Sequence, residues 1–284
     1  MTTIIPRLRD FWKRFRKHGA AVVGLAITIM FLVIALFAPW LAPHDYRVQR
    51  LEHRLQPPCS EHRLGTDEFG RDVLSRIIMG TRVSCLVGFS ATFLAVSIGT
   101  VVGLTAGIFG GAPDSILMRI TDIFMAVPSL FLMIVVVALF GPSLTNTVLV
   151  IGFVNWTGTA RLARAGALQA RSLGYVEAAK AIGCSHLRMV YKHILPNIAA
   201  PIIVQASLFL GQAIGYEAGL SYLQLGAQPP TPSWGNMVAD AQRFLTTNMW
   251  APAYPGLAIL ITVLGFNLVG DGVRDALDPK LIGS

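Results

Sequence analysis

The chain has 284 residues, of which 54% are hydrophobic and only 13% are charged, and its formal net charge is +8. About a quarter of the residues of a soluble domain are charged, so this composition excludes an ordinary soluble protein and indicates a membrane protein. Basic residues collect in cytoplasmic segments and attract anionic headgroups, so the charge does not predict nucleic acid as a partner. The three cysteines lie far apart and indicate neither a disulfide framework nor a zinc site.

The N-terminal segment 1–18 predicts an amphipathic helix on the cytoplasmic membrane surface. Its apolar residues recur at helical spacing between basic residues; they are Leu8, Phe11, Trp12 and Phe15. A disordered basic tail is the alternative. The apolar run that follows is too long for the apolar region of a signal peptide, so we expect an uncleaved first span.

Apolar runs long enough to cross a bilayer lie at roughly 20–41, 84–109, 116–140, 144–163, 198–223 and 253–270. They lack the alternation of barrel strands, so they predict an all-α, polytopic membrane protein with about six transmembrane helices. We divide the chain into the segment 1–18, a first span with a periplasmic loop (19–83) and a five-helix core (84–284). Small residues at Gly99, Gly103 and Gly107 predict the close approach of another helix.

The positions of lysine and arginine predict the orientation. Basic residues are concentrated before the first run and after the fourth, which places both segments and both termini in the cytoplasm. The loop between the first two runs is also rich in arginine, although its acids nearly balance the charge.

A polar segment, YVEAAKAIGCSHLRMVYKHILPN (175–197), follows the fourth run. Strong helix formers surround Glu177, Gly183 interrupts them, and a second helix is predicted to run until Pro196. This second helix carries an apolar stripe of Leu187, Val190, Tyr191 and Ile194. The stripe fits either a surface helix that packs on its own bundle or on headgroups, or a helix that docks in the groove of a separate soluble protein.

The same segment resembles the EAA loop of permease subunits in ATP-binding-cassette importers. The pattern is Glu177-Ala178-Ala179, then Gly183 four residues later, then Ile194-Leu195-Pro196. Three further stretches resemble the peptide and nickel permease family: HRLGTDEFGRDVLSR (62–76), LSYLQLGAQPPTPSWGNMVADA (220–241) and LGFNLVGDGVRDALDPK (264–280). With the six-run layout they cover nearly the whole chain. Gln224 departs from the family, which usually has a glycine there, and this puts a close backbone approach at that position in doubt.

The resemblance implies the transmembrane domain of a type I ABC importer, with segment 175–197 as the coupling helix in a cleft of an ATP-binding subunit. Glu177 would offer charge or hydrogen bonds to that subunit, Ala178 and Ala179 would keep the contact close, and Gly183 would make the turn. Leu187 completes the set of coupling residues that we expect.

The implied partners are a homologous second permease, two ATP-binding subunits and a periplasmic substrate-binding protein, with membrane lipid around them. The sequence contains no Gly-Lys pair and therefore no G-x-x-x-x-G-K-[ST] loop, so ATP and Mg²⁺ would be bound by the partner subunits and no cofactor by this chain. Nothing resembles a hydrolytic or redox site, and we expect a pore-forming subunit rather than an enzyme.

Candidate site residues lie elsewhere as well. Glu217 is an acid inside a predicted span, so it either lines the transport pathway or makes a structural hydrogen bond. GTDEFGRD lacks the spacing of an EF-hand and is better explained by turns that Asp67 and Asp72 cap. By resemblance this region covers the outer mouth, where a substrate-binding protein docks, and QPPTPSW (228–234) predicts a stiff periplasmic loop over the same mouth. The candidate outer-mouth contacts are Asp67, Arg71, Asp72 and Trp234.

His44, His53 and His62 fall in the same loop. Imidazoles suit nickel, but loop histidines at nine-residue spacing are more often solvated, so we assign no metal site here. They keep nickel, or a nickel chelate, as the alternative substrate.

The sequence thus predicts a permease subunit that moves di- or oligopeptides across the bacterial inner membrane by alternating access. The alternatives from other classes are a self-contained secondary transporter, for which Glu217 is the only candidate midplane charge, and a scaffold without a transport role.

Overall fold

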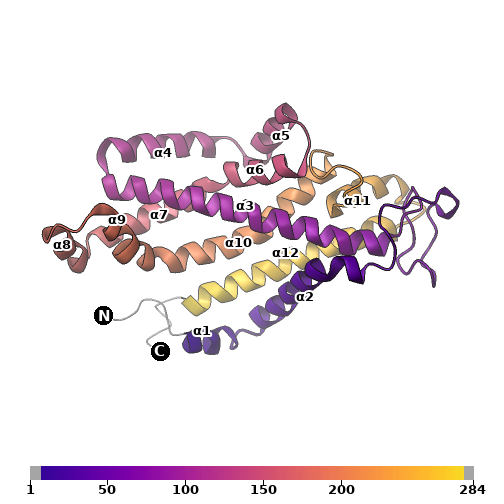
Figure 1. Cartoon of the computed structure of the whole chain (residues 1–284), viewed down its shortest axis with the longest axis horizontal. Coiled ribbons are helices and arrows are strands. Elements are labelled where there is room, and N and C mark those ends of the chain that lie inside the picture. The colour runs from indigo at the N-terminus through magenta and orange to yellow at the C-terminus, as the bar shows by residue number, and fades with distance from the viewer. Residues whose placement is uncertain (1–7, 278–284) are drawn as a thin grey trace.

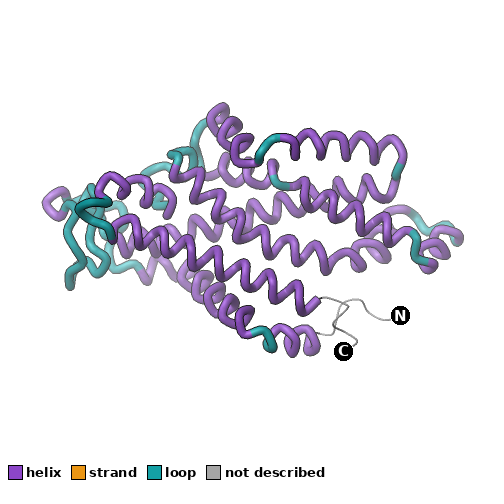
Figure 2. Tube along the Cα trace, turned by 180° about the vertical axis from the view of Figure 1, so that it is seen from behind, coloured by secondary structure: helices purple, strands orange, loops and turns teal. Residues whose placement is uncertain are grey.

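The computed structural model describes residues 8–277, and within that range the chain is helical, with an isolated bridge between Thr66 and Asp72 as its only β-type pairing. The long helices run side by side along one axis (Figure 1). The loop before α3 (Val73–Phe109) lies at one end with α11 (Trp234–Ala241), and α8 (Gly174–Ala181) and α9 (His186–Met189) lie at the opposite end. Seen from behind, the loops also gather mainly at the end that holds α11 (Figure 2).

The other helices are α1 (Leu8–Phe15), α2 (Gly19–Leu41), α4 (Gly111–Ala126), α5 (Ser129–Phe140), α6 (Leu144–Val154), α7 (Trp156–Arg171), α10 (Leu195–Tyr222) and α12 (Trp250–Leu277). Two short 3₁₀ helices, η1 (Leu51–His53) and η3 (Gln242–Phe244), lie at the α11 end, and a π-helical turn spans Val190–Ile194.

In the described part of the chain, four helices are long and apolar enough to cross a membrane: α2, α3, the helical run Leu187–Tyr222, and α12. A fifth span results if α4 and α5 are counted as one, although they are bent by 89°. The predicted run 116–140 is therefore not a straight helix. Val127 precedes Pro128 and takes an extended conformation, as the residue before a proline prefers, and this ends α4.

The predicted run 144–163 is also divided. Asn155 ends α6 and begins α7, and neither helix reaches the length of a full span on its own, although both pack along α3. The predicted boundary between the outer loop and the core at residue 83 falls inside a helix, because α3 begins at Val73. Asp72 caps this helix: its Oδ2 accepts a hydrogen bond of 2.7 Å from the Ser75 backbone N–H.

The predicted N-terminal helix is present as α1, and part of its apolar face packs on the protein itself. Phe15 is buried against Ala21 of α2 and Ala276 of α12. Trp12 stays exposed, with the Arg16 guanidinium 5.9 Å from its ring centroid. A helix is present over residues 8–15, so a disordered tail is wrong for these residues. Residues 1–7 of the predicted segment lie outside the described residues, and its position on the membrane surface stays a prediction.

The predicted close helix approach occurs between α3 and α7. A Cβ atom built on Gly103 would lie 2.2 Å from the Ala160 carbonyl oxygen and 2.7 Å from the Ala163 Cβ. Gly99 and Gly107 face α7 in the same way, with Cβ clashes of 2.4 Å and 2.6 Å to the nearest α7 atom. These glycines bring the two backbones into contact, as small residues do in membrane helix pairs.

The arginines of α7 hold α4 beside it. Arg164 makes a bidentate pair with Asp114, with nitrogen–oxygen distances of 2.5 and 2.6 Å, and Arg161 pairs with Asp122 at 2.5 Å. A bidentate arginine–carboxylate pair fixes geometry as well as charge. In the sequence, the basic residues of this part of the chain predict only a cytoplasmic location. In the structure, Arg161 and Arg164 also hold α4 against α7.

We expect Gly103→Ala to destabilise the protein by about 1–3 kcal/mol, because the new methyl group meets backbone atoms that must shift. Gly215→Ala is the matched control, since a Cβ there meets no heavy atom of the described residues within 4 Å. Thermal unfolding of the purified chain in detergent checks this. Equal melting temperatures for the two variants would contradict the close packing of α3 on α7.

Candidate functional site

The α8–α9 segment has one buried face and one exposed face. Val176 and Met189 are buried and join the apolar cluster that α3, α7 and α10 form at this end. Glu177 and Ala178 are exposed, and Ala179 is buried. A hollow of about 430 Å³ opens under this segment, and Glu177, Arg171 and Ser172 are among the residues that line it. The segment therefore packs on its own bundle and still presents a free surface.

Gly183 makes the turn between α8 and α9, as the sequence predicts. Its φ angle is +78°, in the left-handed region that favours glycine. A Cβ atom there would meet no heavy atom of the described residues within 4 Å. The backbone conformation, and not a close contact within this chain, is what requires glycine here.

The predicted end of the second helix at Pro196 is wrong. The helix continues from Leu187 through the π turn into α10, and Pro196 lies in the first turn of α10. Inside an α-helix a proline ring clashes with the carbonyl four residues earlier. The wider π turn, in which the Leu195 N–H reaches the Val190 carbonyl, comes directly before the proline and accommodates it.

The predicted apolar stripe is split in the structure. Ile194 is buried and Val190 is half-buried, whereas Leu187 is 71% exposed and Tyr191 is 69% exposed. The i and i+4 pairs stay together, Leu187 with Tyr191 outside and Val190 with Ile194 inside, whereas the i and i+3 pairs are separated. The prediction assumed a regular α-helix, and a π turn has more residues per turn, so i and i+3 positions no longer share a face. Ile182, beside the turn, is 86% exposed and adds to the free apolar surface.

Glu217 lies on α10 at the other end of the bundle and is fully buried, with 0% exposure. The hydroxyls of Ser221 and Ser233 donate to one carboxylate oxygen at 2.7 Å each, and the Ser84 hydroxyl donates to the other at 3.4 Å. These serines belong to α10, to the loop before α11 and to α3. The carboxylate thus makes the hydrogen bonds of the structural alternative, while a part in the pathway stays a prediction.

Trp234 does not lie at the surface. It is 2% exposed, its ring packs edge-on against Phe31 of α2, and its indole N–H donates to the Ile77 carbonyl at 3.0 Å. A Cβ atom on Gly80 would lie 2.8 Å from this ring. Trp234 fills the space between α2 and α3, so the predicted contact of its side chain at the outer mouth would require this packing to open.

Asp67, Arg71 and Asp72 come together in the outer loop but act mainly inside it. Asp67 accepts hydrogen bonds from the Phe69 and Arg71 backbone N–H groups and from the Arg71 side chain, at 2.6–2.9 Å. Arg71 and Asp72 are buried. The predicted capped turns are confirmed, whereas direct contact of Arg71 or Asp72 with a partner would require the loop to open.

The three histidines of the outer loop also converge, which their sequence spacing did not predict. The ring centroids of His44 and His62 are 4.8 Å apart, and those of His53 and His62 are 5.9 Å apart. His62 is buried, and His44 and His53 are half-buried, so the expectation of solvated side chains is wrong.

Gln224 has a backbone conformation that favours glycine. Its φ angle is +63°, so a non-glycine residue occupies the left-handed region, and its N–H donates to the Ser221 carbonyl at 2.9 Å. The close approach occurs two residues later, where a Cβ atom on Gly226 would lie 1.9 Å from the Ser221 hydroxyl oxygen.

Solved structures identify the class of this fold. A chain of the MetNI methionine ABC transporter in an inward-facing conformation matches 72% of this chain and 97% of its own length, with a TM-score of 0.59 at 19% identity. A chain of an amino acid ABC transporter with histidines matches with a TM-score of 0.56 at 16% identity, over 71% of this chain and 94% of its own length. The fold is that of a type I ABC importer transmembrane domain.

The sequence comparisons are more specific. A family model described as "Binding-protein-dependent transport system inner membrane component" matches residues 99–283, and one described as "N-terminal TM domain of oligopeptide transport permease C" matches residues 7–58. The chain therefore belongs to the binding-protein-dependent transport system inner membrane components, a family of multi-pass membrane proteins. The resemblance seen in its motifs is confirmed.

Individual relatives cover nearly the whole chain. The dipeptide transport system permease protein DppC of Escherichia coli is 47% identical over 96% of this chain and 93% of its own length. DppC of Alkalihalophilus pseudofirmus is 45% identical over 98% and 92%. The glutathione transport system permease protein GsiD of Pectobacterium atrosepticum is 42% identical over 96% and 91%.

We expect Glu217→Ala to destabilise the protein by at least about 1–3 kcal/mol, because buried hydroxyls lose their acceptor. Glu217→Gln should keep most of the stability, since an amide oxygen can still accept these bonds. The measurements are thermal unfolding and uptake per amount of folded protein. Normal unfolding of Glu217→Gln together with loss of uptake would contradict a purely structural role and favour the pathway alternative.

Proposed function

We propose that this chain is the permease subunit of an ATP-driven importer that carries di- or oligopeptides across the bacterial inner membrane by alternating access. The observation that carries the proposal is the two-faced α8–α9 segment. Its buried side chains pack on α3 and α7, and its exposed ones (Ile182, Leu187 and Tyr191) form an apolar surface. Exposed apolar surface on a polar connecting segment is typical of a docking site for another protein.

The proposed partners are two ATP-binding subunits, a second permease of similar layout and a periplasmic binding protein. ATP and Mg²⁺ would be bound by the ATP-binding subunits, and this chain would contribute the pathway without catalysing hydrolysis. The α8–α9 end would lie in the cytoplasm, and α1 and the end of α12 lie toward that end in Figure 1. Both termini would then be cytoplasmic, and the outer loop would face the periplasm.

A continuous path supports the transmission of movement. The helix that begins at Leu187 runs without a break into α10, which carries Glu217 at the opposite end. Through Ser84 and Ser233, Glu217 contacts α3 and the loop before α11. A displacement of α8 and α9 by an ATP-binding subunit would therefore reach the outer end through one continuous helix, as the proposed alternating access needs.

The relatives favour peptides as the substrate class. Their names specify dipeptide and glutathione transport, and both kinds of substrate carry peptide bonds and terminal charges. These relatives give nickel no support, and we do not propose it as cargo. Membership of a binding-protein-dependent family also favours an importer subunit over a secondary transporter or a scaffold.

We expect dipeptides, delivered by the cognate binding protein, to stimulate ATP hydrolysis several-fold in the reconstituted complex, whereas nickel chelates should not. The measurement is phosphate release in vesicles that contain all subunits, with glutathione as a third test substrate. Stimulation by nickel chelates alone would overturn the substrate class. Transport by this chain alone under an ion gradient would overturn the importer mechanism.

We expect Leu187→Asp to weaken association with the ATP-binding subunits at least about tenfold, since a charge replaces an exposed apolar side chain at the proposed interface. Glu177→Lys should likewise abolish ATP-driven uptake without preventing membrane insertion. Leu51→Asp is the matched control, because Leu51 is 70% exposed but lies at the opposite end.

Co-purification of the ATP-binding subunits with each variant measures the effect. Normal association and uptake in both Leu187→Asp and Glu177→Lys would show that α8 and α9 are not the coupling surface.

A further inference from the structure

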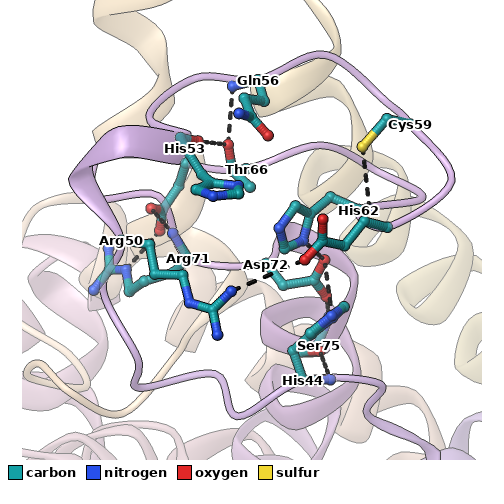
Figure 3. A network of polar contacts seen from close by, with 12 residues as sticks. His44, Arg50, His53, Gln56, Cys59, His62, Thr66, Arg71, Asp72 and Ser75 are labelled. Carbon is teal, nitrogen blue, oxygen red and sulfur yellow. Dashed lines mark hydrogen bonds and ion pairs between the residues drawn. The ribbon is translucent and has the colours of Figure 1, made fainter.

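The outer loop contains a cluster of imidazoles that transport does not explain. His53 ends η1, and His62 lies in the turn before the bridge between Thr66 and Asp72. The Thr66 hydroxyl donates to the His53 carbonyl and accepts a hydrogen bond of 2.9 Å from the Gln56 backbone N–H, which ties η1 to this turn. Figure 3 shows His62 between His53 and Asp72.

Asp72 fixes the orientation of His62. His62 Nδ1 lies 2.9 Å from Asp72 Oδ1, while Asp72 Oδ2 accepts the Ser75 N–H at the start of α3. Because an ionised carboxylate can only accept a hydrogen bond, Nδ1 carries the proton, and in the neutral imidazole Nε2 then has the free lone pair. In metal sites, a carboxylate that accepts a hydrogen bond from the other ring nitrogen of a histidine ligand orients that ligand in the same way.

Several ring nitrogen atoms of the cluster lack hydrogen-bond partners. Among the described residues, His62 Nε2, His53 Nδ1 and His44 Nδ1 are buried and accept or donate no hydrogen bond. Burial of an unpaired polar atom costs about 1–3 kcal/mol, so such atoms call for a ligand. His62 is only 4% exposed, and its free nitrogen points away from the carboxylate that holds it.

We propose that His53, Glu61 and His62 bind a divalent transition-metal ion of the zinc class at the outer end of the protein. One donor atom of each residue lies within 4.8 Å of the donor atoms of the other two. Two imidazoles and a carboxylate suit Zn²⁺, whereas Mg²⁺ and Ca²⁺ prefer oxygen ligands throughout. Three protein ligands leave a coordination position for water.

The carboxylate of Glu61 lies on the solvent-exposed side of this site and is free to bind an ion. Its side chain is 55% exposed, and its contact with the Arg50 guanidinium is long, at 3.9 Å. An exposed pair of this kind contributes little, so the carboxylate can turn to an ion without a large cost. A metal ion would join η1 to the turn before α3 and so hold the outer loop against the end of that helix.

A second donor set, His44, His62 and Asp72, overlaps with the first. Asp72 already uses both oxygens, one for His62 and one for the cap of α3, and His44 Nδ1 is 3.7 Å from it. If Asp72 bound a metal ion, it would lose either its hydrogen bond with His62 or its cap of α3. His44 is therefore the control residue, and Asp72 is a positioning residue rather than a ligand.

The test uses the purified importer complex, stripped with a chelator and then titrated with Zn²⁺ alone or Co²⁺ alone. We expect one equivalent of Zn²⁺ that survives desalting and a visible Co²⁺ spectrum, both lost or weakened at least about tenfold in His53→Ala and in Glu61→Gln. His44→Ala should bind like the wild type. These variants spare the cap of α3, which His62→Ala would disturb.

Equal metal content in the wild type and His53→Ala would overturn the proposal, since the ion would then come from elsewhere in the complex. Loss of binding in His44→Ala with retention in His53→Ala would also overturn it, in favour of the second donor set. Metal content is measured without transport, so these outcomes are independent of the substrate and coupling mechanism.

Discussion

The close contact between α3 and α7 determines the positions of most other elements. Along the face that contains Gly99, Gly103 and Gly107, α3 lets backbone atoms of α7 approach to distances that a single methyl group would prevent. Since α7 leads directly into α8, this contact positions the surface proposed for the ATP-binding subunits. The α7 residues Arg164 and Arg161 also hold α4 through Asp114 and Asp122. The other end of α3 carries Asp72 and the outer loop, so one helix connects the two ends of the protein.

Hydropathy and small-residue spacing predicted the parts of the fold that depend on local sequence. The spans α2, α10 and α12 correspond to long apolar runs. The three glycines predicted a close helix contact, although not that α7 is the partner. Hydropathy measures how apolar a segment is and not the direction of its helix axis. It therefore could not predict the 89° bend after Val127 or the division of α6 from α7, both of which lie inside apolar runs. The π turn was missed because helical patterns assume a constant number of residues per turn.

Within the candidate site, the motif predicted the turn at Gly183, because a turn depends on neighbouring residues. The burial of Trp234 could not be predicted, since its hydrogen-bond acceptor, the Ile77 carbonyl, is 157 residues away in sequence. The same applies to the histidines, which a 3₁₀ helix and an isolated bridge bring together. The nine-residue spacing of these histidines does not predict how the loop folds, so their side chains were expected to be solvated although they form a cluster.

The π turn at Val190–Ile194 amounts to one extra residue in an otherwise continuous helix. Each residue of an α-helix turns its successor by about 100°, so this insertion sets the rotational phase between the α9 surface and the membrane part of α10. A chain with one residue fewer here could keep every apolar run and every motif residue and still point Leu187 and Tyr191 in a different direction. The length of this turn, as much as the identity of the exposed residues, therefore decides which way the α9 surface faces.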